Sequence, residues 1–382
     1  MALQNMTGKL AAGWPRRRDE AASIARLAPL EPVRDNPGQL NGLFFVPDSV
    51  AGPMPLVVVL HGCTQTAEIY DRGVGWSTLA TRYGFALLFP EQQRSNNPLL
   101  CFNWFSVNDT QRGMGEAASI KSMIDTMKRN HAIDPARIFV TGLSAGGAMT
   151  SVMLATYPEL FEAGAILGGL AYGCASHMTE ALDCMGGRTR SAADELSAVV
   201  RRASPNRGKW PRVQVWQGDA DTTVTPGNAD DIVRQWTGLH GLGATADVVE
   251  PVEGFPRARW LDADGSPVIE QYTITGMGHG VPIAPRRGGE QALGVSGAHM
   301  LDVGLSSTQH IAEFFGLDRP IERPAARPMD DAATAEPTKR SLATEIRTAP
   351  RPVHQRRPKA TPHAQGVQAI IEKALKAAGL MR

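Results

Sequence analysis

The sequence predicts an α/β fold in which a mostly parallel sheet is covered by helices on both faces. Short runs rich in β-branched and aromatic residues recur from about Gly42 onward and are typical of buried strands. Stretches in which apolar residues recur at helical spacing lie between several of these runs. Because the strand-like runs are apolar along their whole length, they favour parallel strands that are buried on both sides.

Strands are expected where an apolar run is bounded by glycine, proline or polar residues. They comprise residues 42–47, 55–61, 85–90, 137–142, 162–169, 212–218 and 268–275. Helices are expected where the apolar spacing is helical, and they comprise residues 115–130, 144–158 and 228–239. Pro158 ends the second predicted helix, and Asn228 is expected to cap the third.

The domain organisation is predicted from a change of composition near residue 317. Residues 42–317 are expected to form one α/β domain after an N-terminal extension, residues 1–41. Residues 318–366 are rich in proline, arginine and alanine and are interpreted as a linker. Residues 367–382 regain a helical stripe and are expected to form an amphipathic helix that docks on the domain, with a partner or surface as the alternative.

Composition and charge exclude several classes of protein. Charged residues make up 20% and apolar residues 42% of the 382 residues, which is ordinary for a globular enzyme. The net charge of +1 favours neither nucleic acid nor an anionic membrane as a partner. Apolar runs such as Leu56–Leu60 are too short to span a bilayer. No signal peptide is recognisable after Arg18, so a cytoplasmic location is the default expectation.

The cysteines do not indicate a metal site. Cys63, Cys101, Cys174 and Cys184 are too few for a disulfide scaffold, and no pair has C-x-x-C spacing. Cys63 and Cys101 each follow a predicted strand, so their loops are expected at the same edge of the sheet and within bridging distance. Cys174 and Cys184 lie in one loop-like stretch that a disulfide would close, and buried thiols are the alternative for both pairs.

A serine between glycines is the strongest chemical signal. The stretch "VTGLSAGGAMTS", residues 140–151, reads as strand, turn and helix in that order. Such a turn exposes the hydroxyl of Ser144 at the end of a strand, where it can attack a substrate carbonyl.

A nucleophilic serine needs a base and an acid, which follow it in the chain in parallel-sheet hydrolases. His279 is the preferred base because it lies between glycines in a loop after a predicted strand. His299 and His310 are expected to contact solvent or to pack. Asp219 and Asp221 both follow the predicted strand 212–218, and either can supply the carboxylate.

The oxyanion of an acyl-transfer reaction needs two hydrogen-bond donors. The first predicted donor is the backbone N–H of Ala145, directly after the nucleophile. The second is the backbone N–H of Cys63, since that residue follows the predicted strand 55–61. His61 is expected to shape this loop and to have no catalytic role.

These motifs together resemble a known family. "LHGCTQ", "CFNWF", "GLSAGG", "GDADTTV" and "GMGHG" occur in this order and are similar to the catalytic domain of short-chain polyhydroxyalkanoate (PHB) depolymerases. The resemblance implies an α/β-hydrolase fold, an extracellular location and kinship with feruloyl and acetylxylan esterases. It also implies that Asp221 is the acid and that Trp104 lines the substrate cleft, with a buried structural role as the alternative for Trp104. Gly280 and Val281 depart from the Ala-Trp that follows the histidine in many depolymerases, so a different cleft is expected.

The function predicted from the sequence is therefore that of a serine carboxylic-ester hydrolase without cofactor or metal. Short-chain 3-hydroxyalkanoate polyesters or oligomers are the expected substrates, and feruloyl or acetyl esters on plant polysaccharide are the alternative. An inactive protein that uses the cleft for binding is the alternative from a different class.

Overall fold

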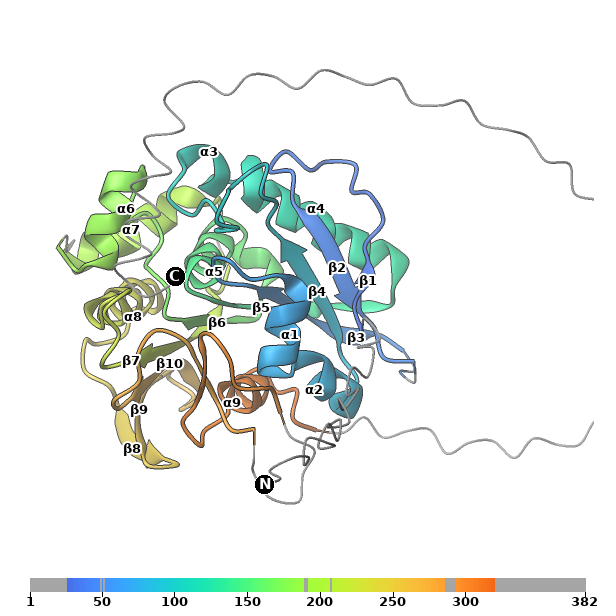
Figure 1. Ribbon diagram of the computed structural model, residues 1–382. Coiled ribbons are helices and arrows are strands. Elements are labelled where there is room, and N and C mark those ends of the chain that lie inside the picture. Colours follow the sequence, from blue (N-terminus) through green and yellow to red (C-terminus); the bar gives the residue numbers. More distant parts are fainter. Residues whose placement is uncertain are drawn as a thin grey trace, which may run out of the picture.

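One large sheet forms the centre of the computed structural model (Figure 1). The structure describes residues 26–319 apart from residues 49, 51, 189–191, 207 and 286–292. The predicted C-terminal helix, residues 367–382, and nearly all of the predicted linker, residues 318–366, lie outside the described residues. The core of the predicted α/β domain lies within them.

The sheet has ten strands in the order β1-β2-β4-β3-β5-β6-β7-β10-β9-β8. In that order their bounds are Ala28–Pro29, Asn41–Phe45, Ala86–Glu91, Met54–Leu60, Ile133–Leu143, Ala163–Leu167, Arg212–Gly218, Pro267–Ile274, Phe255–Leu261 and Val248–Val252. Neighbouring strands from β4 to β10 are parallel, which confirms the predicted mostly parallel sheet. The two strands at each edge of the sheet pair antiparallel to their neighbours.

Helices cover both faces of the sheet, as predicted (Figure 1). One face is covered by α1, α2 and α9, which span Ala67–Val74, Trp76–Tyr83 and Ser307–Phe314. The other is covered by α4, α5, α7 and α8, which span Gly115–Asn130, Ala145–Thr156, Ala193–Ala203 and Gly227–His240. The alternating side chains of β3 show the division, since Val58 packs with α4 and α5 whereas Val57 packs with α1 and α2.

Shorter elements complete the described part of the chain. They are α3 (Val107–Thr110), the 3₁₀ helix η1 (Pro158–Leu160), α6 (Met178–Met185) and a second, two-stranded sheet of β11 (Val281–Ile283) and β12 (Met300–Asp302). The predicted cap of α8 is wrong. The helix begins at Gly227, so Asn228 lies in its first turn, where its side-chain amide donates to the carbonyl oxygen of Thr225 (3.0 Å).

The described part of the predicted N-terminal extension packs against the domain. Strand β1 pairs with β2, so this segment adds an edge to the sheet. Leu27 and Leu40 are both buried, each in the apolar layer on one of the two faces. Residues 27–40 therefore belong to the same folded unit as the domain, and Leu27 and Leu40 reach its core.

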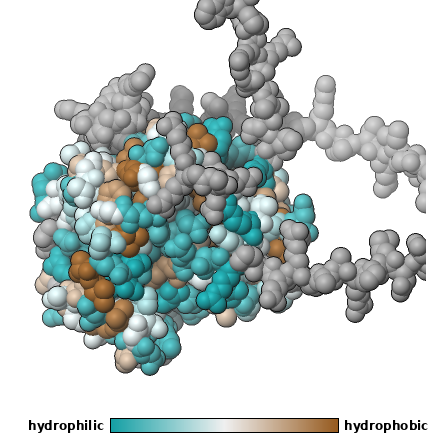
Figure 2. Space-filling model, turned by 90° about the horizontal axis from the view of Figure 1, so that it is seen from below, coloured by the Kyte–Doolittle hydropathy of each residue, from teal (hydrophilic) through white to brown (hydrophobic). Residues whose placement is uncertain are grey.

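The surface is mostly polar on the face shown in Figure 2, where hydrophobic areas are separated by hydrophilic ones. Val249 and Val295 are among the exposed large apolar side chains, and single exposed residues of this kind are ordinary on protein surfaces. Among the helices of the described residues, none combines the length and the apolar character that crossing a bilayer requires.

Candidate active site

Ser144 lies at a strained turn between β5 and α5. Its backbone dihedrals are φ 57° and ψ −117°, a left-handed region that a residue with a side chain rarely adopts. The backbone N–H of Ser144 donates to the carbonyl oxygen of Leu167 at the end of β6 (2.9 Å), which holds the turn in place. A strained, over-determined residue of this kind is typical of a nucleophile at a strand-to-helix turn.

The glycines around Ser144 are required by close backbone contacts. A Cβ atom on Gly146 would lie 2.3 Å from the carbonyl oxygen of Leu60 and 2.5 Å from that of His61. A Cβ atom on Gly142 would lie 2.4 Å from the carbonyl oxygen of Gly146. The first turn of α5 therefore rests directly on the end of β3, and only glycine fits there.

Asp221 and His279 are hydrogen-bonded to each other. The Nδ1 atom of His279 lies 2.7 Å from Oδ2 of Asp221, and the two side chains are 6% and 2% exposed. The other carboxylate oxygen, Oδ1, accepts from the backbone N–H groups of Thr223 (2.8 Å) and Val224 (2.9 Å). These bonds fix the carboxylate so that Oδ2 faces the imidazole.

Asp219 has a different position. It is exposed, and its Oδ1 accepts from the backbone N–H of Gly276 (2.6 Å), which joins the loops that follow β7 and β10. The local sequence did not decide whether Asp219 or Asp221 supplies the carboxylate. In the structure, Asp221 is the one of these two that contacts the imidazole of His279.

The second ring nitrogen of His279 has no partner among the described residues. In the neutral imidazole, an Nδ1 that donates to the carboxylate leaves the lone pair on Nε2, which is buried without a hydrogen bond. A Cβ atom on Gly168 would lie 3.2 Å from Cε1 of His279, and the preceding residue, Leu167, accepts from the amide of Ser144. Ser144 and His279 therefore both lie against residues 167–168, and Nε2 of His279 makes no hydrogen bond to Ser144.

His299 lies beside His279. Its Nδ1 donates to the carbonyl oxygen of His279 (3.1 Å), and its own carbonyl oxygen accepts from the N–H of Val281 (2.8 Å). Two bonds therefore hold the backbone of the loop that carries His279. The sequence placed His299 among packing or solvent-facing residues and gave no sign of this contact.

The two predicted oxyanion donors lie on segments that are close together. Gly146 in α5 contacts the end of β3, and the donors are next to this contact. Ala145 is the first residue of α5, and Cys63 follows β3. A disulfide joins Cys63 to Cys101, with the two Cα atoms 4.2 Å apart, as expected from the positions of their loops. In the other pair, the Cys184 thiol donates to the carbonyl oxygen of Cys174 (2.6 Å) and no disulfide is present.

His61 is a structural residue of the loop after β3. Its Nδ1 donates to the carbonyl oxygen of Gly62 (2.8 Å), and its Nε2 accepts from the backbone N–H of Gln92 (3.1 Å). Burial lowers the pKa of His61 to about 4, so the ring is neutral. Both ring nitrogens are occupied, which leaves none for proton transfer.

Trp104 is half-buried and packs at the junction of two apolar clusters. It contacts Phe105 edge-to-face, with ring centroids 5.5 Å apart. It also packs on the small cluster formed by Ala148, Leu170, Cys184 and Val224. Ala148 lies about one helical turn after Ser144, so Trp104 packs near the start of α5.

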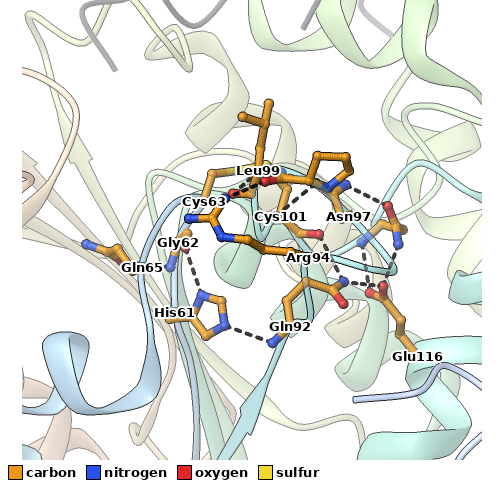
Figure 3. The surroundings of a disulfide bond; sticks show 12 residues. His61, Gly62, Cys63, Gln65, Gln92, Arg94, Asn97, Leu99, Cys101 and Glu116 are labelled. Atoms are coloured by element: carbon orange, nitrogen blue, oxygen red, sulfur yellow. Dashed lines mark hydrogen bonds between the residues drawn. A yellow bond between two sulfur atoms is a disulfide. The ribbon is translucent and has the colours of Figure 1, made fainter. Parts of the chain in front are cut away.

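Polar residues behind the Cys63 loop were missed by sequence reasoning (Figure 3). The Gln65 side chain accepts from the backbone N–H of Gly62 (2.9 Å). Glu116, at the start of α4, is fully buried among amide donors. The signal available in the sequence was its position one helical turn before Ile120, on the apolar stripe of a predicted helix. Within the described ranges, no group of three or more histidine, cysteine, aspartate or glutamate side chains is arranged to hold a metal ion.

Comparison with known proteins gives consistent matches. A family model described as "Esterase PHB depolymerase" matches residues 40–250. The chain is 44% identical over 298 residues to poly(3-hydroxyalkanoate) depolymerase C of Paucimonas lemoignei, covering 78% of this chain and 72% of the relative. It is 33% identical over 264 residues to an acetylxylan esterase of Coprinopsis cinerea, covering 67% and 70%.

Two further relatives extend the comparison to other esters. Feruloyl esterase B of Talaromyces stipitatus is 30% identical over 267 residues, covering 68% of this chain and 73% of the relative. Among solved structures, an acetyl xylan esterase from Aspergillus awamori superposes with a TM-score of 0.65 and 25% identity. That match covers 76% of this chain and 99% of the other, so the described fold is that of an esterase.

Proposed function

Because the chain belongs to the esterase PHB depolymerase family and is a serine ester hydrolase, we propose that it cleaves short-chain 3-hydroxyalkanoate polyesters or their oligomers through an acyl-enzyme on Ser144. The relative with 44% identity is named as a poly(3-hydroxyalkanoate) depolymerase, which supports this substrate class.

In the proposed mechanism, Ser144 attacks the ester carbonyl while Nε2 of His279 takes the hydroxyl proton. Asp221 holds the imidazole through Nδ1 and stabilises its positive form. The backbone N–H groups of Cys63 and Ala145 stabilise the oxyanion, His279 protonates the leaving alcohol, and water then releases the acyl group through the same base.

The observation that carries the proposal is the hydrogen bonding of the two ring nitrogens of His279. Its Nδ1 is held by a buried carboxylate, while its Nε2 is buried and has no hydrogen-bond partner among the described residues. A ring nitrogen without a partner, on an imidazole that a carboxylate orients, is suited to accept a proton. The dihedrals of Ser144 support its assignment as the donor of that proton.

A substrate panel tests the proposal. The purified protein is incubated with 3-hydroxybutyrate dimers, trimers and a polymer suspension, and in parallel with acetylated xylan and methyl ferulate. The proposal predicts release of 3-hydroxybutyrate and its short oligomers as the dominant activity. Acetate or ferulate release as the dominant activity would favour the alternative that the acetylxylan and feruloyl relatives suggest.

Covalent labelling separates an enzyme from an inactive binding protein. A fluorophosphonate probe reacts only with a serine that an adjacent base activates. Labelling at Ser144 is expected, and an unlabelled protein that still binds oligomers would show that the cleft serves binding alone.

A further inference from the structure

A buried carboxylate lies behind the loop that carries Cys63, and the proposed mechanism does not use it. Glu116 is 0% exposed. Its Oε1 accepts from the side-chain amides of Gln92 (2.6 Å) and Asn103 (2.6 Å), and its Oε2 accepts from the backbone N–H of Asn103 (2.8 Å). Figure 3 shows the side chain of Glu116 directed toward Gln92 and toward the disulfide loop.

The orientation of the donors is fixed by their other hydrogen bonds. The side-chain oxygen of Gln92 accepts from the backbone N–H of Gln93 (2.9 Å), so its NH₂ group must face Glu116. The side-chain oxygen of Asn103 accepts from the amide of Asn97 (2.9 Å), with the same consequence. Every named partner of Glu116 is therefore a donor, an arrangement that suits an acceptor-only carboxylate.

Such a carboxylate is costly to keep inside a protein. Burial raises the pKa of Glu116, whereas the hydrogen bonds from Asn103 and Gln92 favour the charged carboxylate. An apolar side chain would fill this space at a lower cost in free energy. The carboxylate is therefore expected to have a role, which its hydrogen-bond donors identify.

The first route from Glu116 to Cys63 passes through the disulfide. The amide of Gln92 that contacts Glu116 also donates to the carbonyl oxygen of Cys101 (3.0 Å). Cys101 is bonded to Cys63, and the N–H of Thr64 donates to the carbonyl oxygen of Leu99 (2.6 Å). Glu116 thereby fixes the segment to which the Cys63 loop is tied.

The second route passes through His61 and sets the direction of one peptide. The backbone N–H of Gln92 donates to His61, and His61 donates to the carbonyl oxygen of Gly62. The Gly62–Cys63 peptide is trans, since no cis peptide occurs in the described part of the chain. In a trans peptide the N–H points away from the C=O, so holding the oxygen of Gly62 aims the N–H of Cys63.

We infer that Glu116 is a positioning residue for the oxyanion donor Cys63. It acts through Gln92 along both routes, and its two bonds from Asn103 fix the same segment two residues after Cys101. This inference rests on the proposed function, because it assigns the Cys63 amide to the oxyanion. An amide that acts only on the transition state raises kcat without a matching change in KM, so a displaced amide lowers kcat selectively.

The test is the variant Glu116→Gln, assayed with a soluble chromogenic butyrate ester. Glutamine keeps the size of the side chain but turns an NH₂ group toward the donors of the network. We expect kcat to fall about 10- to 100-fold, with KM changed less than about twofold. This reduction in kcat does not exceed the one that follows removal of a whole oxyanion donor. The matched control is Glu270→Gln, which alters another buried carboxylate that accepts from an amide, Gln214 (2.8 Å), on strands away from the Cys63 loop.

A double-mutant cycle adds a readout that a purely structural role would not move. Removing the disulfide with Cys63→Ala and Cys101→Ala and then adding Glu116→Gln should cost less than the product of the separate losses, because both changes release the same amide. Multiplicative losses, or equal losses in kcat for Glu116→Gln and Glu270→Gln, would overturn the inference.

Two further outcomes are distinguishable. If Glu116→Gln does not fold, Asn103→Ala removes one donor to the carboxylate and is expected to lower kcat in the same way, and an unchanged kcat would overturn the inference. If the wild-type protein hydrolyses no ester, the proposed function fails. If the wild type and Glu270→Gln are active and Glu116→Gln keeps the wild-type kcat, only the assignment of Glu116 fails.

Discussion

The Nδ1 atom of His279 lies 2.7 Å from Oδ2 of Asp221, and neither side chain has appreciable contact with solvent. The carboxylate is in turn held by the backbone of its own loop, so the imidazole is oriented by a fixed partner. This relationship selects one aspartate of two that are close in sequence.

Asp221→Asn should lose much more activity than Asp219→Asn. The amide leaves the imidazole without an anionic partner and favours the wrong tautomer, a change that costs roughly 10⁴-fold in kcat in a serine protease. Asp219 bonds only the backbone of the Gly276 turn, so a loss below about tenfold is expected there. Steady-state kinetics on a soluble ester compares the two variants, and the reverse ranking would assign the acid to Asp219.

Gly146→Ala should disrupt the turn between β5 and α5 that carries Ser144. The added methyl group would lie 2.3 Å from the carbonyl oxygen of Leu60, so α5 must move away from β3 and carry Ser144 with it. We expect loss of nearly all activity and a fall of about 1–3 kcal/mol in the free energy of unfolding. Gly243→Ala is the control, since a Cβ atom there meets no atom within 4 Å. A fully active Gly146→Ala variant would contradict the geometry of the turn.

The free energy of unfolding should fall on acidification because of His61. Its pKa is about 4 in the fold and 6.5 in the absence of burial, so unfolding takes up a proton between these values. The stabilising contribution is therefore complete above pH 6.5 and is lost toward pH 4, a change on the order of 3 kcal/mol. Urea titrations across this pH range measure it.

The variant His61→Asn should show a flatter dependence of stability on pH than the wild type, because asparagine does not titrate. Equal slopes for the wild type and His61→Asn would show that His61 does not change its protonation on unfolding.

Removing the disulfide should destabilise the domain. Cys63 and Cys101 are 38 residues apart, and opening a loop of this length costs up to about 4 kcal/mol in chain entropy alone. Thermal unfolding of Cys63→Ala with Cys101→Ala should therefore show a lower midpoint than the wild type. Cys174→Ala is the matched control because that residue forms no disulfide in this structure. Equal midpoints for all three proteins would exclude a stabilising role.

The parallel centre of the sheet was predictable because its strands are buried on both faces and read as unbroken apolar runs. Strands β8 and β9 were not, since their side chains are mostly exposed or half-buried and β8 contains Pro251. The edge strand β1 has only two residues, too few for any periodicity.

The sequence could point to Ser144 and His279 because each of them has its own local motif. The choice between Asp219 and Asp221 depends on which loop amides bond which carboxylate, and that is fixed only by the folded backbone. Glu116 was hidden because the stripe Ile120, Met123 and Met127 accounts for the burial of α4 without it. The available signal was a charged residue on the predicted buried face of a helix, which an analysis of apolar periodicity does not register.

The most direct test of the account is the position of the acyl group in the reaction intermediate. The protein is mixed with excess chromogenic butyrate ester, quenched in acid during the initial burst of product, digested and analysed by mass spectrometry. A butyryl group is expected on the peptide that contains Ser144, with no acylated peptide and no burst in Ser144→Ala. Acylation of a different residue, or sustained ester hydrolysis by Ser144→Ala, would contradict it.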